Sequence, residues 1–117
     1  KALPETLGQL TKLTDLRVDA NMLFSLPSSM GQLVSLQELH LSSNELKSLP
    51  ESLAQLRHLE TLNLFYNEIT HLPENLGQLM SLRKLHLGSN RLEMLPESIG
   101  QLSLLQELYL ANNELSS

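Results

Sequence analysis

Residues 59–81 read LETLNLFYNEITHLPENLGQLMS, and this arrangement of leucine, asparagine, proline and glutamine recurs along the whole 117-residue chain. The period is 23 residues, without insertion or deletion, and three columns show it. The prolines are Pro4, Pro27, Pro50, Pro73 and Pro96; the asparagines are Asn21, Asn44, Asn67, Asn90 and Asn113; the glutamines are Gln9, Gln32, Gln55, Gln78 and Gln101. The sequence therefore predicts one domain, residues 1–117, made of five copies of one structural unit.

The unit LxxLxLxxNxLxxLPxxLGQLxx predicts one short strand and one short helical turn per repeat. Leu62 and Leu64 alternate with Asn63 in the two-residue period of a strand. Proline in the Leu-Pro-Glu segment is favoured at the start of a helical turn, and glutamate is favoured near its positive end. The predicted fold class is an α/β solenoid, a leucine-rich repeat horseshoe arc. Its parallel, concave β-sheet has about five strands, and its convex side carries short helical or 3₁₀ turns.

The repeated polar and small residues are predicted to build the coil and not to form a site. Each column asparagine follows a strand where the chain turns inward, so its amide should be buried and bonded to the backbone of its own and adjacent coils. Proline fixes φ where the chain leaves the strand side, and glycine is expected to permit a tight bend.

Composition argues against several classes of protein. The chain has no cysteine and no Asn-x-Ser/Thr site, which favours a cytoplasmic location over the alternatives, a secreted bacterial effector or an extracellular protein. A net charge of -5 argues against nucleic acid as a partner. No apolar run approaches the roughly 18 to 20 residues of a membrane span.

Motifs for catalysis and for cofactor binding are also missing. The sequence contains no phosphate loop, no Gly-x-Ser-x-Gly and no His-Glu-x-x-His, so we expect neither an enzyme nor a cofactor. His40 and His86 share a column but lie two coils apart, at about 10 Å, too far to share a zinc ion with bonds of about 2 Å. No metal site is therefore expected.

The phrase Leu-Pro-x-x-Leu-Gly-Gln-Leu resembles that of intracellular leucine-rich repeats of the Ras-associated class, over nearly the whole chain. Residues 49–56 depart from the phrase only at Ala54. Similar repeats occur in scaffold proteins of cell polarity and Ras signalling, in plant relatives and in bacterial effectors. The resemblance implies a protein-interaction module in intracellular signalling or scaffolding.

Strand positions that are not leucine should point to the concave face and are free to choose a protein partner. The candidate partner-binding residues are Asp15, Arg17, Glu38, His40, Asn63, Phe65, Tyr66, Lys84, His86 and Tyr109. Exposed aromatic residues dominate interface hot spots, so Phe65, His86 and Tyr109 are expected to form one patch. For Tyr66 the alternative is that it packs on the loop between coils.

Two other functions stay open. The repeats could be the substrate-recognition part of a larger enzyme or bacterial effector, or a self-assembling or antigen-binding unit that forms a homo-oligomer through its terminal coils.

Solenoids need polar caps, and residues 1–12 and 111–117 contain no obvious cap, so the chain is expected to be a fragment or uncapped. Met22 and Phe24 make the first repeat more apolar than the others, which favours contact with a preceding cap; the alternative is contact with a partner chain.

Overall fold

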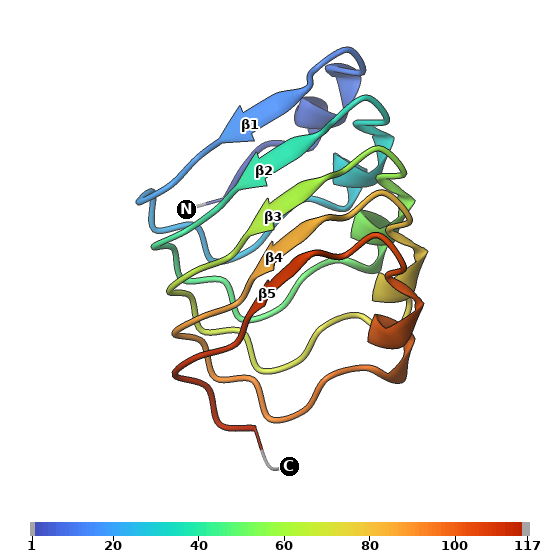
Figure 1. Cartoon of the computed structure of the whole chain (residues 1–117). Helices are drawn as coiled ribbons and strands as arrows, with labels where there is room; N and C mark the ends of the chain where they lie inside the picture. The colour runs from blue at the N-terminus through green and yellow to red at the C-terminus, as the bar shows by residue number, and fades with distance from the viewer. Residues whose placement is uncertain (1, 116–117) are drawn as a thin grey trace.

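The computed structural model describes residues 2–115, which wind into five stacked coils (Figure 1). Each coil contributes one three-residue strand to a single parallel sheet in the order β1-β2-β3-β4-β5. The strands are β1 (Asp15–Arg17), β2 (Glu38–His40), β3 (Thr61–Asn63), β4 (Lys84–His86) and β5 (Glu107–Tyr109). Each residue pairs with its equivalent in the next repeat, as Leu39 does with Leu62. The predicted leucine-rich repeat arc is confirmed.

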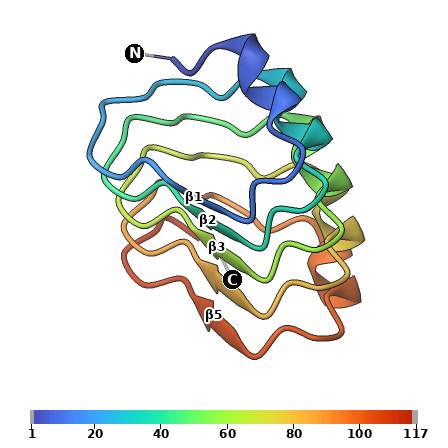
Figure 2. The ribbon, with the colours of Figure 1, turned by 90° about the horizontal axis from the view of Figure 1, so that it is seen from above.

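Short 3₁₀ helices line the side of each coil away from the sheet (Figure 2). They are η1 (Glu5–Gln9), η2 (Ser28–Gln32), η3 (Glu51–Gln55), η4 (Leu76–Gln78) and η5 (Glu97–Gln101). Proline directly precedes every one of them except η4, with φ between -73° and -68°, the value its ring imposes. The predicted 3₁₀ turns and their proline starts are confirmed, apart from the start of η4.

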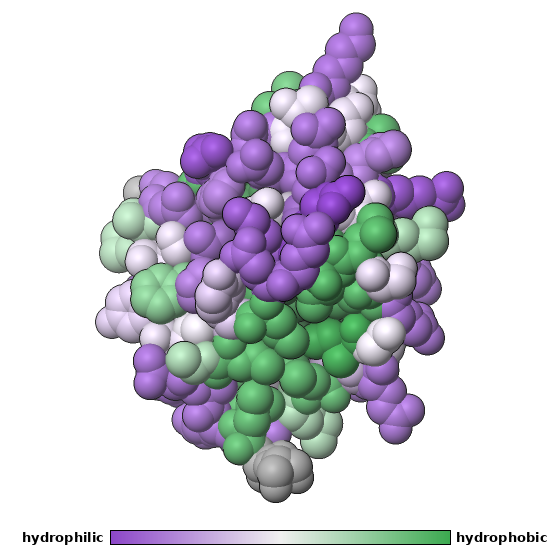
Figure 3. Space-filling view, viewed as in Figure 1, coloured by the Kyte–Doolittle hydropathy of each residue, from purple (hydrophilic) through white to green (hydrophobic). Residues whose placement is uncertain are grey.

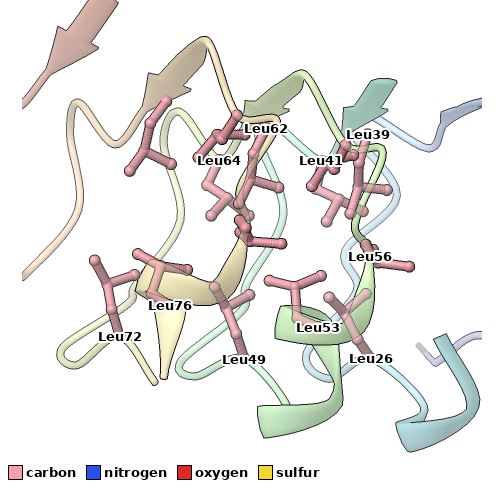
Figure 4. Packing of buried hydrophobic residues seen from close by; sticks show 14 of the residues in the cluster. Leu26, Leu39, Leu41, Leu49, Leu53, Leu56, Leu62, Leu64, Leu72 and Leu76 are labelled. Carbon is pink, nitrogen blue, oxygen red and sulfur yellow. The ribbon is translucent and has the colours of Figure 1, made fainter. Parts of the chain in front are cut away.

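The core is a ladder of leucines that fills the space between the sheet and the 3₁₀ helices (Figure 4). Leu39, Leu62 and Leu85 point inward from the middle of successive strands and are fully buried. Burying one such side chain stabilises the fold by roughly 1.5–3 kcal/mol. Because every coil contributes the same set, each coil is held mainly by its two neighbours.

The asparagine column forms the predicted buried ladder. The Asn67 side-chain amide donates to the carbonyls of Leu41, in the preceding coil, and Leu64, at 3.0 and 3.1 Å. Its Oδ1 accepts the Leu46 N–H at 3.1 Å. Asn44 and Asn90 are buried in the same way, whereas Asn21 is exposed and its side-chain amide donates to Asp19 in its own coil.

The expectation that glycine permits a tight bend was wrong. No glycine has a positive φ, and all five lie in the described part of the chain. The left-handed positions are instead Ala20, Met22, Ser43, Tyr66, Ser89 and Asn112. A Cβ at Gly31 would lie 2.7 Å from the Ser52 carbonyl oxygen of the next coil. The repeated glycine is needed because neighbouring coils approach each other closely there.

The junction between the third and fourth coils departs from this packing. Ala54 replaces the glycine and is buried. Opposite it, Asn75 stands where serine stands in the second, third and fifth repeats, and η4 has three residues where the other helices have five. The larger side chains of Ala54 and Asn75 and the shortened helix η4 thus all lie at the junction between the third and fourth coils.

None of the helices within residues 2–115 has the length and apolar character of a membrane span.

Candidate interaction surface

The concave sheet face carries nine of the ten predicted binding residues. The central leucines of β1 to β4 pack in or against the core, so the residues on either side of each of them point outward, and β5 continues the same register. These outward positions are Asp15 and Arg17, Glu38 and His40, Thr61 and Asn63, Lys84 and His86, and Glu107 and Tyr109. Phe65 lies on the same face just beyond β3, and Tyr66 lies at its edge. The 23-residue spacing therefore predicted which of these residues share one face of the sheet.

Three ring side chains from successive coils form a row, which we call the aromatic row: Phe65, His86 and Tyr109. The ring centroids of Phe65 and His86 are 5.1 Å apart, and those of His86 and Tyr109 are 4.8 Å apart. Phe65 is 40% and Tyr109 47% exposed, whereas His86 is half-buried between them. The patch expected from the sequence is present.

Gly88 shapes the aromatic row, a role that sequence reasoning missed. A Cβ at this glycine would lie 3.1 Å from His86 Cε1 and 3.4 Å from Phe65 Cδ1. The Gly88 N–H also donates to His86 Nδ1 at 3.3 Å, which orients the imidazole. The equivalent positions in the other coils carry side chains. The glycine at this position was therefore the feature of the sequence that could have indicated its role.

Glu107 anchors one end of the row and was not among the predicted residues. The Tyr109 hydroxyl donates to Glu107 Oε1 at 2.5 Å, and Lys84 Nζ lies 3.7 Å from Glu107 Oε2. The hydrogen bond from Tyr109 holds the pKa of Glu107 below its ordinary value, against a smaller desolvation effect. The same bond raises the pKa of Tyr109. Lys84 and Glu107 are 23 residues apart, so the repeat could have predicted their pairing.

The first two coils carry charge in place of aromatic rings. Arg17 lies 3.2 Å from Glu38 and 3.6 Å from Asp15, and His40 Nε2 lies 3.1 Å from Glu38 Oε1. A carboxylate can only accept, so Nε2 of His40 carries the hydrogen. That hydrogen bond is the main cause of the lowered pKa of Glu38; desolvation opposes it and Arg17 adds to it. We call Asp15, Arg17, Glu38 and His40 the ionic cluster.

Asp15, Glu38 and His40 could together offer three ligand atoms to a metal ion, all within 4.8 Å of one another. The Arg17 guanidinium, however, already supplies a positive charge to both carboxylates. The histidine column of the sequence pointed only to His40 and His86, and this group was not predicted because it crosses from one coil to the next.

Asn63 and Tyr66 differ from the other predicted residues. Asn63 Oδ1 accepts the Phe65 N–H at 3.0 Å, so this amide also fixes the chain leaving β3. Tyr66 has φ 61° and is 63% exposed, with its ring centroid 6.2 Å from that of Phe65. Its side chain is mostly open to solvent and borders a hollow of about 570 Å³ that also includes Ser43 and Arg91.

Comparison with known proteins places this arrangement among repeat domains. A family model described as a leucine-rich repeat region matches residues 39–117. No curated protein sequence matches the chain.

Solved structures of similar fold cover almost the whole chain. A leucine-rich repeat protein of Leptospira interrogans is 36% identical with a TM-score of 0.96, over 99% of this chain and 30% of that one. PEPR1–AtPEP1 is 32% identical with a TM-score of 0.91, over 100% of this chain and 17% of that one. The leucine-rich repeat domain of the type III effector XopL is 32% identical with a TM-score of 0.88, over 99% of this chain and 42% of that one. The chain thus spans less than half of each.

Proposed function

Because this chain belongs to the leucine-rich repeat family, whose domains are generally non-catalytic protein-interaction modules, we propose that it binds a protein partner on its concave sheet face. The proposal includes a role in intracellular signalling or scaffolding, as the resemblance to Ras-associated-class repeats implies. The observation that carries the proposal is the aromatic row.

The aromatic row has the properties of an interface hot spot. Phe65 and Tyr109 present large apolar area on a rigid sheet, and their rings are held by His86 and by the Tyr109 to Glu107 hydrogen bond. Ordering these side chains on binding therefore requires little conformational entropy, and a buried aromatic ring removes roughly 150–250 Å² from water. Aromatic side chains of this kind supply most of the binding energy in many interfaces.

The ionic cluster supports selection among partners. Its side chains are paired with one another at the sheet surface, so a partner must match an existing pattern of charge. Exposed charges at the rim of an interface mainly set the association rate and its salt dependence. We therefore assign affinity to the aromatic row and discrimination to the ionic cluster.

Quantitative pull-down from a native lysate tests this assignment. The double variant Phe65→Ala/Tyr109→Ala removes both exposed rings of the aromatic row, and Met94→Ala, an exposed apolar residue away from the sheet, is the matched control. We expect the proteins enriched by the wild-type chain to be lost with the double variant and kept with the control. Equal enrichment by all three chains would contradict the concave face as the binding site.

A second candidate is substrate recognition within a larger enzyme or effector. It is supported by the 32% identity to the repeat domain of a type III effector. Determining the full reading frame tests this candidate. A catalytic domain in the same polypeptide would support it, and a reading frame with repeats alone would remove it.

A third candidate is a unit that self-assembles through its terminal coils or that binds an antigen. The supporting observation is an apolar surface over the last coil, where Leu104, Leu108 and Leu115 are exposed (Figure 3). Light scattering over a range of concentrations tests self-assembly. Growth of the mass with concentration, abolished by Leu108→Asp, would support it, and a constant monomer mass would reject it.

The proposed location is the cytoplasm, supported by the lack of cysteine in a chain of 117 residues. Fractionation of the source cells with an antibody to the chain tests this. Recovery in the culture medium or at the cell surface would favour the effector or extracellular alternative.

A further inference from the structure

A second column of irregular residues lies away from the sheet, directly after each Gln-Leu pair. Its members are Thr11, Val34, Arg57, Met80 and Ser103. The backbone positions them by a tight three-residue turn: Leu56 has φ -80° and ψ 76°, and the Arg57 N–H donates to the Gln55 carbonyl at 2.9 Å. These are the features of an inverse γ-turn. The same N–H to carbonyl bond forms at Val34, Met80 and Ser103, so the backbone of these positions is fixed although the residue types vary.

Two hollows of about 500 Å³ each flank Arg57. One is lined by Gly31, Val34 and His58, among others, and the second by Gly77 and Met80, among others. Gln55 and Arg57 line both of them, so the arginine stands on the boundary between the two hollows.

The close packing of the coils creates these hollows. Gly31 and Gly77 have no side chain, and the glutamine of the next coil lies over each of them. Gln55 Oε1 is 2.6 Å from the place of a Gly31 Cβ, and Gln101 Oε1 is 2.8 Å from that of Gly77. The glycines and glutamines therefore form the floor of each hollow, whereas Val34, Arg57 and Met80 project above that floor. Val34 is 52% and Met80 63% exposed.

The charge of Arg57 lacks a counterpart within residues 2–115. Arg17, on the sheet face, lies within 4 Å of two carboxylates, whereas the Arg57 side chain makes neither an ion pair nor a hydrogen bond with any described residue. An unpaired guanidinium between two exposed apolar side chains is therefore complementary to a carboxylate that has apolar neighbours.

We propose that this flank, Val34, Arg57 and Met80 with the two hollows, is a second interaction surface that binds an extended acidic segment of a protein partner. A glutamate or aspartate of that segment pairs with Arg57, whose planar fork suits two parallel hydrogen bonds to a carboxylate. Aliphatic side chains two residues to either side cover Val34 and Met80. Alternate residues of an extended segment face the same way at about 6.7 Å spacing, close to the roughly 5 Å between coils, and the long side chains accommodate the difference.

Nuclear magnetic resonance with a synthetic peptide tests the proposal. The probe is acetyl-Leu-Ala-Glu-Ala-Leu-amide, titrated into the isotope-labelled chain. We expect saturable shifts of the Arg57 Nε–H and of the Val34 and Met80 signals. The matched peptide with glutamine in place of glutamate should bind about fivefold more weakly. Absence of saturable shifts, or equal binding of the two peptides, would overturn the proposal.

Variants separate this surface from the concave face. Arg57→Gln should weaken the glutamate peptide about fivefold, and Arg83→Gln, which removes an exposed arginine outside the hollows, should leave it unchanged. The double variant Phe65→Ala/Tyr109→Ala should bind the peptide as the wild type does. If that variant alone lost the peptide, the acidic segment would belong to the concave face, and the flank would be rejected independently of the proposed function.

Discussion

The Nδ1 atom of His86 accepts the backbone N–H of Gly88, two residues further along the same coil, at 3.3 Å. The bond requires a lone pair on Nδ1, so the ring hydrogen lies on Nε2. It also holds the imidazole between Phe65 and Tyr109. The geometry of the aromatic row thus depends on a residue that contributes no side chain to it.

Replacing this glycine should disturb the aromatic row more than the fold. In Gly88→Ala the new Cβ meets His86 Cε1 at 3.1 Å, so the ring must shift by a few tenths of an ångström. We expect weaker nuclear Overhauser contacts between His86 and Phe65 and a stability loss of about 1 kcal/mol or less, because both rings can move toward solvent. Unchanged ring contacts would show that Gly88 does not shape the row.

The asparagine ladder predicts that two Asn-to-Ala substitutions, one buried and one exposed, differ strongly in their effect on the free energy of unfolding. Asn67→Ala leaves the buried Leu46 N–H without its acceptor and removes one of the two asparagine donors from each of the Leu41 and Leu64 carbonyls. It should therefore lower the free energy of unfolding by about 2–4 kcal/mol. Asn21→Ala removes an exposed amide and should change it by less than about 0.5 kcal/mol. Urea denaturation measures both values. If the two variants lost the same free energy of unfolding, burial of the asparagine side chain would not be the source of its stabilising effect.

The close approach of the coils predicts a similar contrast between two glycines. Gly31→Ala forces a methyl group against the Ser52 backbone and should destabilise the chain by about 1–3 kcal/mol. At Gly100 no atom lies within 4 Å of the added methyl group, and φ is not positive. Gly100→Ala should therefore be neutral or stabilising by up to about 1 kcal/mol. Chemical denaturation of both variants tests this, and a stabilising Gly31→Ala would refute it.

The hydrogen bond from Tyr109 predicts the acid titration of Glu107. In Tyr109→Phe the donor is lost, so the pKa of Glu107 should rise toward its ordinary value of 4.5. The Glu107 carboxyl carbon, followed by magnetic resonance as the pH is lowered, reports the change. Tyr66→Phe is the control and should leave this pKa unaltered.

The same pair sets the sign of a pH effect on stability. The folded-state pKa of Glu107 lies below its ordinary value, so its contribution is present above about pH 4.5 and is lost as the pH falls through the folded-state pKa. Loss of stability on raising the pH through this range would contradict the assignment. Glu38, whose pKa is lowered mainly by His40, should behave in the same direction.

Much of the fold could be predicted from the sequence because each repeat makes the same local choices. The alternation of Leu62 and Leu64 around Asn63 identified the strand, and Pro50 identified the start of a 3₁₀ helix. The 23-residue period then assigned partners to each strand, since equivalent residues of neighbouring repeats pair directly.

Contacts between coils were predicted less well. The glycine column was interpreted as a bend, although its reason is the backbone of Ser52 and its equivalents in the following coils. The ionic cluster was missed because Arg17 and Glu38 are 21 residues apart, one coil along and one strand position across. A pattern within one repeat contains no information on such diagonal distances.

The sequence by itself determined the repeat, the strands, the buried leucines and the outward positions, because all four follow from periodicity and from local backbone preference. Only the tertiary structure decided which of these side chains are paired and which are not. It placed the His86 ring on the Gly88 N–H, paired Glu107 with Tyr109, and left Arg57 unpaired between two hollows. The physical reason is that these relationships depend on the spacing of the coils and on side-chain rotamers, and the repeat pattern specifies neither of them.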